Sequence, residues 1–320
     1  MDLSVIVPVY NGEKTLKSTF LSLMAQENCD FSWEIVAVDD GSADESLRVL
    51  ASFEETAAEK GILLRILSFE NKGVGVNRNR GLAAAKGDVI LFLDADDLLL
   101  PEALSRLMKK KKEKDAAILL FDSEFLYPDG TTSPFPMANA KEGYLSVAEY
   151  MLSQPCPWNK LIDRSIFTDH ELSFEEGILY EDLALIPALG QYARGKIYYH
   201  KEVCHRYFQS EGSIMRGSNP EKRLDIFPAL EALFKNAPEH QTVLCYLFFL
   251  HLYRGAVWDF LENGQKDAIR RANRLMKSFF PSWEENPLVL RKTTRKERFI
   301  ARLFLKECFF LLTLWKGKKQ

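Results

Sequence analysis

The feature that most constrains the fold is the run 88–97, in which five consecutive apolar residues, 89–93, lead into three carboxylates. An apolar run of this length is typical of a strand buried on both faces of a parallel sheet. Because side chains alternate along a strand, we expect Asp94 and Asp96 to point the same way. Two carboxylates at the end of a buried strand suit Mg²⁺ or Mn²⁺, especially when a substrate's phosphates complete the ligand shell. An acidic turn in solvent or a helix N-cap is the alternative for an isolated Asp-x-Asp.

Strand and helix patterns alternate through the first hundred residues. Strands are predicted at 3–9, 33–38, 62–67 and 88–93, and helices at 13–26, 44–59 and 74–86. The tetrapeptide 42–45 resembles a capping box that opens the second of these helices. The alternation predicts a parallel sheet covered by helices on both faces, with ligands at the carboxyl ends of the strands. Polar clusters follow all four strands, at 10–11, 39–40, 71–73 and 94–97, so we expect a site at this edge of the sheet.

The remaining chain divides at about residue 218. Up to that point we predict a helix at 101–114, strands at 116–121 and 124–127, a loop at 129–145 beside the site, helices at 146–153 and 181–193, and a strand at 196–208. From about 219 to 320 the pattern is helical, which predicts a C-terminal helical extension. The fold class is therefore α/β, a Rossmann-like, mostly parallel sheet flanked by helices, followed by an all-helical region.

Composition narrows the class of protein. Apolar residues make up 47% of the chain and charged residues 27%, as in a folded soluble protein, and the net charge of −3 gives no reason to expect nucleic acid as a partner. The five cysteines are scattered without metal-ligand spacing, which fits a reducing cytosol. We see no secretory signal and no apolar run long enough to span a membrane, so we expect a cytoplasmic protein.

The C-terminal residues 291–320 carry an excess of positive charge. They contain ten Lys or Arg against two Glu, a net +8, which leaves −11 on residues 1–290. Basic residues recur there every three or four positions, and they are Arg291, Arg295, Arg298, Arg302 and Lys306. Apolar residues such as Phe299 and Leu303 form a second face of the same expected helix. One interpretation is an in-plane helix on the anionic inner face of the cell membrane. The other is packing on its own domain or on a second subunit, as in a homodimer.

Six segments in order resemble the family 2 glycosyltransferases of the GT-A fold. They are 4–11 (SVIVPVYN), 34–42 (EIVAVDDGS), 71–79 (Asn-Lys-Gly through Arg-Asn), 87–97, 158–161 (WNKL) and 181–183 (EDL). One position departs from the family pattern, because Asn77 stands where the family commonly has Ala. The resemblance implies a GT-A domain at 1–218, with a nucleotide-sugar half at about 1–100 and an acceptor half at about 101–218.

The resemblance also implies a chemistry, which is metal-dependent, inverting transfer of a sugar from a nucleotide diphosphate donor to an acceptor hydroxyl. Mn²⁺ or Mg²⁺ would be held by Asp96 with Asp94 nearby and would neutralise the diphosphate. Asp182 matches the catalytic base, and Glu181 would orient neighbouring groups or contact the acceptor. The alternative is that both carboxylates only begin a helix, where the helix dipole favours them.

The donor site implied by the resemblance lies at the strand ends. Its residues are Pro8, Tyr10, Asn11, Asp39, Asn71, Arg78, Asp94 and Ala95. Asp39 would accept a hydrogen bond from a ring N–H, which favours UDP and leaves dTDP and GDP open; its alternative role is a helix cap. Arg78 would either reach the diphosphate or orient Asp94 and Asp96, and a surface arginine is the other interpretation.

The acceptor side is implied by Trp158 and Asn159, since an aromatic face suits a sugar ring, although core packing of Trp158 is an equally simple explanation. His205 is a weaker candidate for a third metal ligand.

The predicted function is the addition of a sugar, of hexosyltransferase type, to a glycan or lipid-linked acceptor in surface polysaccharide synthesis. The alternatives are an inactive sugar-nucleotide-binding or scaffold protein, and a sugar nucleotidyltransferase. The latter usually needs a Gly-rich basic loop after the first strand, where this chain has Tyr10 to Lys14.

Overall fold

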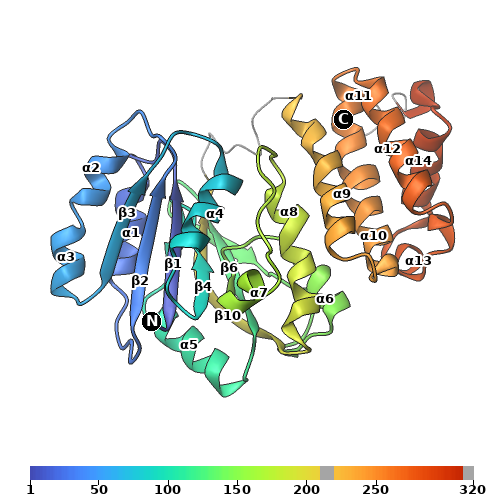
Figure 1. Cartoon of the computed structure of the whole chain (residues 1–320). Helices are drawn as coiled ribbons and strands as arrows, with labels where there is room; N and C mark the ends of the chain where they lie inside the picture. The colour runs from blue at the N-terminus through green and yellow to red at the C-terminus, as the bar shows by residue number, and fades with distance from the viewer. Residues whose placement is uncertain (210–219, 313–320) are drawn as a thin grey trace. The chain divides into compact units, whose positions relative to one another are not determined.

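The computed structural model describes residues 1–209 and 220–312. The chain divides into two compact units, residues 1–217 and 218–320 (Figure 1). The first unit is an α/β domain built on one sheet, and the described part of the second unit is helical. These observations confirm the predicted fold class, an α/β domain followed by a helical C-terminal region.

The described residues of the first unit form one ten-stranded sheet in the order β3-β2-β1-β4-β9-β6-β10-β5, with β7 beside β6 and β8 beside β10. The strands are β1 (Leu3–Val9), β2 (Trp33–Asp39), β3 (Leu63–Ser68), β4 (Val89–Phe92), β5 (Leu98–Leu99), β6 (Ile118–Leu126), β7 (Thr132–Phe135), β8 (Gly143–Tyr144), β9 (Lys160–Asp163) and β10 (Ile197–Phe208). The first four strands are parallel to one another, and so are β6 and β10. Because β9 joins β4 and β6 in antiparallel fashion, the parallel arrangement is interrupted at the middle of the sheet.

Helices cover both faces of this sheet. They are α1 (Leu16–Met24), α2 (Ser46–Ala51), α3 (Glu54–Glu59), α4 (Val74–Ala84), α5 (Ala103–Glu113), α6 (Val147–Met151), α7 (Arg164–Thr168) and α8 (Glu181–Leu185), followed by a 3-10 segment, Ile186–Ala193. One core cluster joins Val5 and Val7 of β1 to α1, α2, α3 and α5. The other joins Ile6 of β1 to α6, α7 and the 3-10 segment. Alternate residues of β1 thus enter different cores, which explains its unbroken apolar sequence.

The predicted helix at 44–59 is two helices, α2 and α3, and the predicted capping box is wrong. Glu45 occupies the N-cap of α2 without a side-chain hydrogen bond. The Ser42 hydroxyl accepts a hydrogen bond from the backbone N–H of Asn11 at 2.9 Å, and the Ser46 hydroxyl accepts one from Gly12 at 2.8 Å. These side chains hold the loop after β1, so they are not available to cap a helix.

The second half of the sheet also differs from expectation. The two strands predicted at 116–121 and 124–127 are one strand, β6. The predicted loop at 129–145 contains β7, which pairs with β6 to form a hairpin, and β8. The helix predicted at 181–193 is the short helix α8 followed by the 3-10 segment, whose second residue is Pro187. Proline lacks a backbone N–H, so the α-helical hydrogen bonding cannot continue unchanged through this position.

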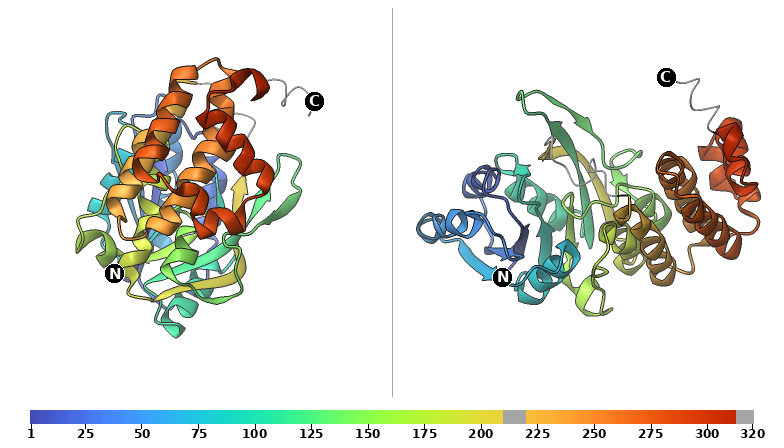
Figure 2. Two further views of the ribbon diagram at one scale, coloured as in Figure 1. Left: turned by 90° about the vertical axis from the view of Figure 1, so that its right-hand side faces the viewer. Right: turned by 90° about the horizontal axis from the view of Figure 1, so that it is seen from above.

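The described part of the second unit is a helical bundle (Figures 1 and 2). Its α-helices are α9 (Ile226–Asn236), α10 (Gln241–His251), α11 (Val257–Glu262), α12 (Lys266–Phe279), α13 (Pro287–Lys292) and α14 (Arg295–Leu305), with 3-10 turns at Lys222–Asp225 and Trp283–Glu285 and a π-helical turn at Leu252–Ala256. Among the described residues no helix has the length and apolar character needed to cross a membrane.

The single basic helix expected from Arg291 onward is interrupted. Thr294 caps α14 in a capping box with Glu297, so α13 and α14 are separate helices. The apolar residues expected on one face also divide. Ile300, Leu303 and Phe304 are buried, whereas Phe299, Phe310 and Leu311 are exposed. The buried group therefore supports packing within its own domain. Trp315 and the lysines after it lie outside the described residues.

Candidate functional site

The loop after β1 contributes the first candidate residues. Pro8 is buried within β1, whereas Tyr10 directly after the strand is 57% exposed and so is available to a ligand. The Asn11 side chain accepts a hydrogen bond from the backbone N–H of Ala43 at 2.9 Å. Asn11 also has a φ of 50°, a left-handed conformation that Asn tolerates better than most residues. Asn11 therefore holds this loop against the loop that follows β2.

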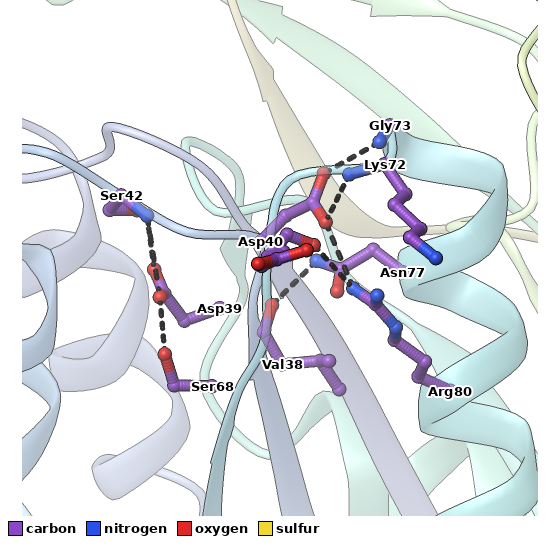
Figure 3. Close-up of polar contacts among 10 residues, drawn as sticks. Val38, Asp39, Asp40, Ser42, Ser68, Lys72, Gly73, Asn77 and Arg80 are labelled. Atoms are coloured by element: carbon purple, nitrogen blue, oxygen red, sulfur yellow. Dashed lines mark hydrogen bonds and ion pairs between the residues drawn. The ribbon is translucent and has the colours of Figure 1, made fainter.

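Asp39 ends β2 and is fully buried. Its carboxylate accepts a hydrogen bond from the Ser68 hydroxyl at 3.0 Å and longer ones from the backbone N–H of Ser42 (Figure 3). No helix in this stretch is capped by Asp39, since the N-cap of α2 is Glu45. The next residue but one, Gly41, has a φ of 72°, and a Cβ there would lie 3.0 Å from the backbone nitrogen of Asn71. This close approach brings the ends of β2 and β3 together.

Asp40 organises the loop that leads into α4. Its carboxylate accepts hydrogen bonds from the backbone N–H groups of Lys72 at 3.0 Å and Gly73 at 2.8 Å, and it pairs with Arg80 at 3.0 Å (Figure 3). Asn77 donates a hydrogen bond to the Val38 carbonyl at 2.6 Å, so the residue that departs from the family pattern ties α4 to β2. Asn71 thus lies in a loop whose backbone is fixed by Asp40.

The carboxylates after β4 form the acidic part of the site. Asp94 and Asp96 are partly exposed, whereas Asp97 is fully buried and accepts a hydrogen bond from the backbone N–H of Phe208 at 2.9 Å. Burial, together with the charges of Asp97 and Asp94, raises the pKa of Asp96 to about 7. A carboxylate cluster of this kind is stabilised in its charged form by a cation. Asp97 Oδ1 is engaged with the backbone and Asp94 Oδ1 with Arg78, so Asp96 and the second oxygen of Asp94 are the candidates to meet a ligand.

Helix α1 holds the backbone of residues 94–97, which we call the acidic turn. The carbonyl of Ala95 accepts hydrogen bonds from the hydroxyls of Thr15 at 3.1 Å and Thr19 at 3.0 Å. Both threonines project from the start of α1, one turn apart. The two threonine hydroxyls therefore satisfy the Ala95 carbonyl, and they fix the position of the backbone between Asp94 and Asp96.

Arg78 joins the acidic turn to the segment that carries the predicted base. It projects from α4 and is buried, with Nη2 3.0 Å from Asp94 Oδ1 and Nη1 in contact with Glu181 Oε1. Burial alone would lower the pKa of Arg78, but the charges of Asp94, Glu181 and Asp182 raise it overall, so the guanidinium stays protonated. These contacts exclude a surface arginine, and the orienting role of Arg78 stays a prediction.

Glu181 and Asp182 begin α8, as the sequence predicts. Burial raises the pKa of Glu181 to about 7, although Arg78 opposes this shift. Burial also raises the pKa of Asp182, which accepts a hydrogen bond from its neighbour Leu183 N–H at 2.6 Å. A raised pKa suits a carboxylate that must take up a proton near neutral pH. Asp182 is partly exposed and Glu181 is buried, so Asp182 is the carboxylate that a substrate can reach.

The segment before α8 is anchored to α4 by Asn79. Its side-chain Nδ2 donates a hydrogen bond to the Phe174 carbonyl at 2.9 Å, and its Oδ1 accepts one from the Phe174 N–H at 2.8 Å. A Cβ on Gly75 of the same helix would lie 2.5 Å from the carbonyl oxygen of Glu175. Sequence reasoning gave Asn79 no role, although it adjoins Arg78 in a segment shared with the family.

Trp158 and Asn159, the predicted acceptor residues, are both buried. Trp158 is 4% exposed, and its ring stacks on His205 at 4.4 Å and on Tyr207 at 5.4 Å between centroids. Asn159 accepts a hydrogen bond from the Lys160 ammonium at 2.6 Å. Trp158 is therefore part of a packed aromatic cluster, and the expectation that its face is open to a sugar ring is corrected.

His205 lies behind the acidic turn. Nδ1 is 3.0 Å from the Ser123 hydroxyl and Nε2 is 3.1 Å from Asp97 Oδ2, and the side chain is fully buried. Burial lowers the pKa of His205 to about 3, so the ring is neutral. Within residues 1–209 and 220–312 no group of three His, Cys, Asp or Glu side chains has an arrangement that could hold a metal ion. Among the described residues, His205 Nε2 and Asp97 Oδ2 are buried and have no hydrogen-bond partner, so a role of His205 as a third ligand beside Asp94 and Asp96 stays a prediction.

Residues 4–168 match the family described as glycosyl transferase family 2, and the chain belongs to that family. The fold is that of a GT-A enzyme: the described chain is similar to the crystal structure of Staphylococcus aureus TarS 1–349 in complex with UDP-GlcNAc, with a TM-score of 0.71 and 21% identity over 96% of this chain and 91% of that one. TarS is named a poly(ribitol-phosphate) β-N-acetylglucosaminyltransferase.

Two other relatives have more general names. An uncharacterized glycosyltransferase of Nostoc, alr2836, is 34% identical over 46% of this chain and 43% of its own length. The glycosyltransferase GlyG of Streptococcus pneumoniae is 28% identical over 67% of this chain and 73% of its own length. The chain spans about half the length of several of the curated relatives it matches, or less.

Proposed function

We propose that this chain is an inverting, metal-dependent glycosyltransferase. It would transfer a sugar from a UDP-sugar to a hydroxyl of a glycan or lipid-linked acceptor in surface polysaccharide synthesis. The observation that carries the proposal is the position of Arg78, which contacts both Asp94 and Glu181. It links the carboxylates suited to a donor's metal ion with the segment that bears Asp182, so donor and base belong to one charged network.

The residues after β4 fit a hard divalent cation. Asp94 and Asp96 offer oxygen ligands, and burial, followed by the negative charges of Asp97 and Asp94, raises the pKa of Asp96. Mg²⁺ and Mn²⁺ are commonly bound by one or two carboxylates together with water and substrate phosphates, so two protein ligands are enough when the donor is present. When bound, the ion would neutralise the charge that develops on the departing diphosphate. The proposed enzyme therefore uses Mn²⁺ or Mg²⁺.

Asp182 would act as the general base. In inverting transfer the acceptor oxygen forms a bond to the anomeric carbon as the bond from that carbon to the diphosphate oxygen breaks, and the nucleoside diphosphate leaves with the electron pair. The proton of the acceptor hydroxyl passes to the Asp182 carboxylate. Its raised pKa improves it as a base, and Glu181 with Arg78 would hold it in position.

The donor would be held at the ends of β1, β2 and β3. Tyr10 is exposed at the first strand end, whereas Asp39 at the second is fully buried, and its carboxylate accepts hydrogen bonds from Ser68 and Ser42. A bound uracil would have to displace one of these contacts to reach it. A carboxylate at this place suits the N3–H of uracil, and the complex of TarS with UDP-GlcNAc supports the same nucleotide for this chain. UDP is therefore the proposed nucleotide, and Pro8, Asn11 and Asn71 would shape the site around it.

The C-terminal unit would contact the inner face of the cell membrane, which suits a lipid-linked acceptor. Support comes from exposed apolar side chains beside exposed cations in the last described helices. The apolar residues are Leu290, Phe299, Phe310 and Leu311, and the cations include Arg291 and Lys306. Apolar anchors next to basic residues are typical of binding to anionic lipid. A homodimer that covers the same side chains is the competing arrangement.

The test of the proposed function is release of UDP from UDP-GlcNAc, UDP-glucose and UDP-galactose, measured with Mn²⁺. Wild type should release UDP from at least one donor, faster with a suitable acceptor glycan. The Asp182→Asn variant should bind UDP as wild type does and lose at least a hundredfold in rate, because its side chain cannot accept the proton. Unchanged turnover in that variant would remove Asp182 from the mechanism, and no release by wild type from any UDP-sugar would contradict the proposed donor class.

A further inference from the structure

One face of the outer sheet carries a row of aromatic side chains. Tyr207 on β10 lies opposite Phe125 on β6 in the parallel ladder. Phe135 on β7 lies opposite Ser123, the residue two positions before Phe125. Because side chains alternate along a strand, Phe125, Phe135 and Tyr207 project from the same face. The opposite face is polar at this place, where Arg206 pairs with Glu124 at 2.7 Å.

These three rings form a connected surface. Phe125 stacks on Phe135 with 4.3 Å between centroids and an angle of 12° between the rings. Tyr207 contacts both, with centroids at 6.0 Å from Phe125 and 6.2 Å from Phe135. All three are partly exposed, unlike Trp158, which covers the inner end of the row. We call Phe125, Phe135 and Tyr207 the aromatic face.

The aromatic face begins beside the acidic turn. Two residues before Tyr207 on the same strand, His205 approaches Asp97 at 3.1 Å. The backbone N–H of Phe208, the residue after Tyr207, donates a hydrogen bond to Asp97 at 2.9 Å. From there the row runs outward along the β6–β7 hairpin, which extends away from the rest of the sheet (Figure 2). Polar groups border it, since the Tyr127 hydroxyl lies 3.0 Å from that of Ser133.

The three rings are partly exposed on a projecting element near the acidic turn, so part of their apolar surface can meet a ligand. Flat aromatic faces bordered by hydroxyl groups are suited to the apolar C–H face of a pyranose, whose own hydroxyls then reach the polar border. The sugar ring nearest the reacting hydroxyl would have to lie on this side of the acidic turn.

We propose that the aromatic face is the acceptor subsite and that it stacks against a pyranose ring of the acceptor glycan. This inference rests on the proposed glycosyltransferase function and adds the class of group that the acceptor presents. The aromatic face, and not Trp158, would then contact the sugar. Trp158 would support Tyr207 by stacking on its ring. The occupant is thus a glycan with pyranose units, in contrast to a bare polyol-phosphate chain.

The test compares glycan binding with nucleotide binding in the full chain. Wild type, with UDP and Mn²⁺ present, is applied to an array of bacterial surface glycans that includes pyranose polymers and poly(ribitol phosphate). The variant Phe125→Leu/Phe135→Leu keeps the hairpin apolar but removes two ring faces, and Tyr207→Leu removes the third. Phe299→Leu, which changes an exposed ring in the C-terminal unit, is the matched control. Calorimetric titration with UDP and Mn²⁺ is performed on all four proteins.

We expect wild type and Phe299→Leu to bind at least one pyranose glycan, and the two aromatic-face variants to bind it at least tenfold more weakly while their affinity for UDP is unchanged. Unchanged UDP affinity also shows that these variants are folded. Equal glycan binding by all four proteins would overturn the proposal, as would binding of poly(ribitol phosphate) alone or of no glycan by a wild type that binds UDP. If wild type bound no UDP, the proposed function itself would fail and the acceptor subsite with it.

Discussion

At the scale of single residues, Arg78 has the greatest influence on the site. It is a buried cation between two carboxylates, one from the acidic turn and one from α8. Removing one partner from such a group leaves uncompensated charge in a poorly solvated place. We therefore expect Arg78 to affect both the stability of the domain and the placement of Asp182.

Arg78→Met is expected to lower the free energy of unfolding by about 3–5 kcal/mol, because Asp94 and Glu181 would lose their counter-charge. Adding Glu181→Gln should recover part of this loss, since one uncompensated charge is then absent. Urea unfolding of wild type, both single variants and the double variant gives the coupling energy. Arg48→Met, which breaks an exposed pair with Glu45, is the control and should change little. Additive effects of Arg78→Met and Glu181→Gln would contradict the buried network.

Lys160 gives a prediction about pH. It is fully buried, and its ammonium donates to Gln154, Cys156 and Asn159 oxygens at 2.6–2.9 Å. Burial lowers its pKa to about 8 from 10.5. Between these two pH values the unfolded chain binds more protons than the folded chain, so the folded state gains stability as pH rises.

Relative to Lys160→Met, the free energy of unfolding of wild type should therefore rise between pH 8 and pH 10.5, by up to about 1.4 kcal/mol per pH unit. Urea unfolding followed by tryptophan fluorescence at several pH values measures this difference, and the variant cancels the titration of other groups. Parallel curves for the two proteins would show that the lysine pKa is not shifted in the folded state.

At the scale of elements, α4 holds the segment that bears the proposed base. Three of its residues contact the segment 174–182: Gly75 by close approach, Arg78 through Glu181, and Asn79 through the Phe174 backbone. The same helix is tied to β2 by Asn77. A single rigid element thus sets the distance between the strand ends that would hold the donor and the carboxylate that would activate the acceptor.

Gly75→Ala should consequently reduce turnover. Its Cβ would lie 2.5 Å from the carbonyl oxygen of Glu175, so the backbone before α8 must move away from α4. We expect kcat to fall at least tenfold with little change in the KM for the UDP-sugar, because the strand ends are untouched. Steady-state kinetics measures both. Gly255→Ala is the control, since its Cβ would meet only the Leu250 carbonyl at 3.8 Å. Equal kcat for the two variants would contradict a positioning role of α4.

The sequence was a good guide to the elements near the strand ends and a poorer one elsewhere. The four parallel strands and α4 are predicted well because their apolar runs are long and are followed at once by turn residues. The predicted capping box at Ser42 is wrong because the Ser42 hydroxyl accepts a hydrogen bond from Asn11, which is distant in the sequence. The Ser46 hydroxyl accepts one from Gly12 in the same way. Strand β7 was missed because the segment around it is rich in Pro, Gly and Thr, a composition typical of a loop.

The same reasoning applies to the site. The order of the motifs predicts Asp94, Arg78 and Glu181 as site residues, and in the structure Arg78 contacts both carboxylates. Whether an aromatic ring is open or covered is a tertiary property, so no local pattern distinguishes Trp158, which is covered, from Tyr207, which is partly exposed. Burial of His205 against Asp97 is likewise set by pairing between distant strands.

At the scale of the whole molecule, the helical unit gives the prediction that concerns the membrane. Full-length protein should sediment with vesicles that contain phosphatidylglycerol and less with neutral phosphatidylcholine, because cations lie beside exposed apolar residues. Phe299→Ser/Phe310→Ser should weaken sedimentation several-fold, and Phe69→Ser, which changes an exposed ring in the first unit, should not. If the double variant sediments as wild type does and light scattering shows a dimer only for wild type, the exposed rings serve a homodimer.

The central claim is that the strand ends form a metal-dependent nucleotide site. Calorimetric titration of the folded chain with UDP, GDP, dTDP and CDP, each with Mn²⁺ and with EDTA, tests it directly. We predict that UDP binds with Mn²⁺, that EDTA or Asp96→Asn weakens this binding at least tenfold, and that Mn²⁺ alone binds poorly because the described residues supply no three-ligand group. Equal UDP affinity in EDTA would contradict the metal role of Asp96, and no binding of any of the four nucleotides would contradict the account as a whole.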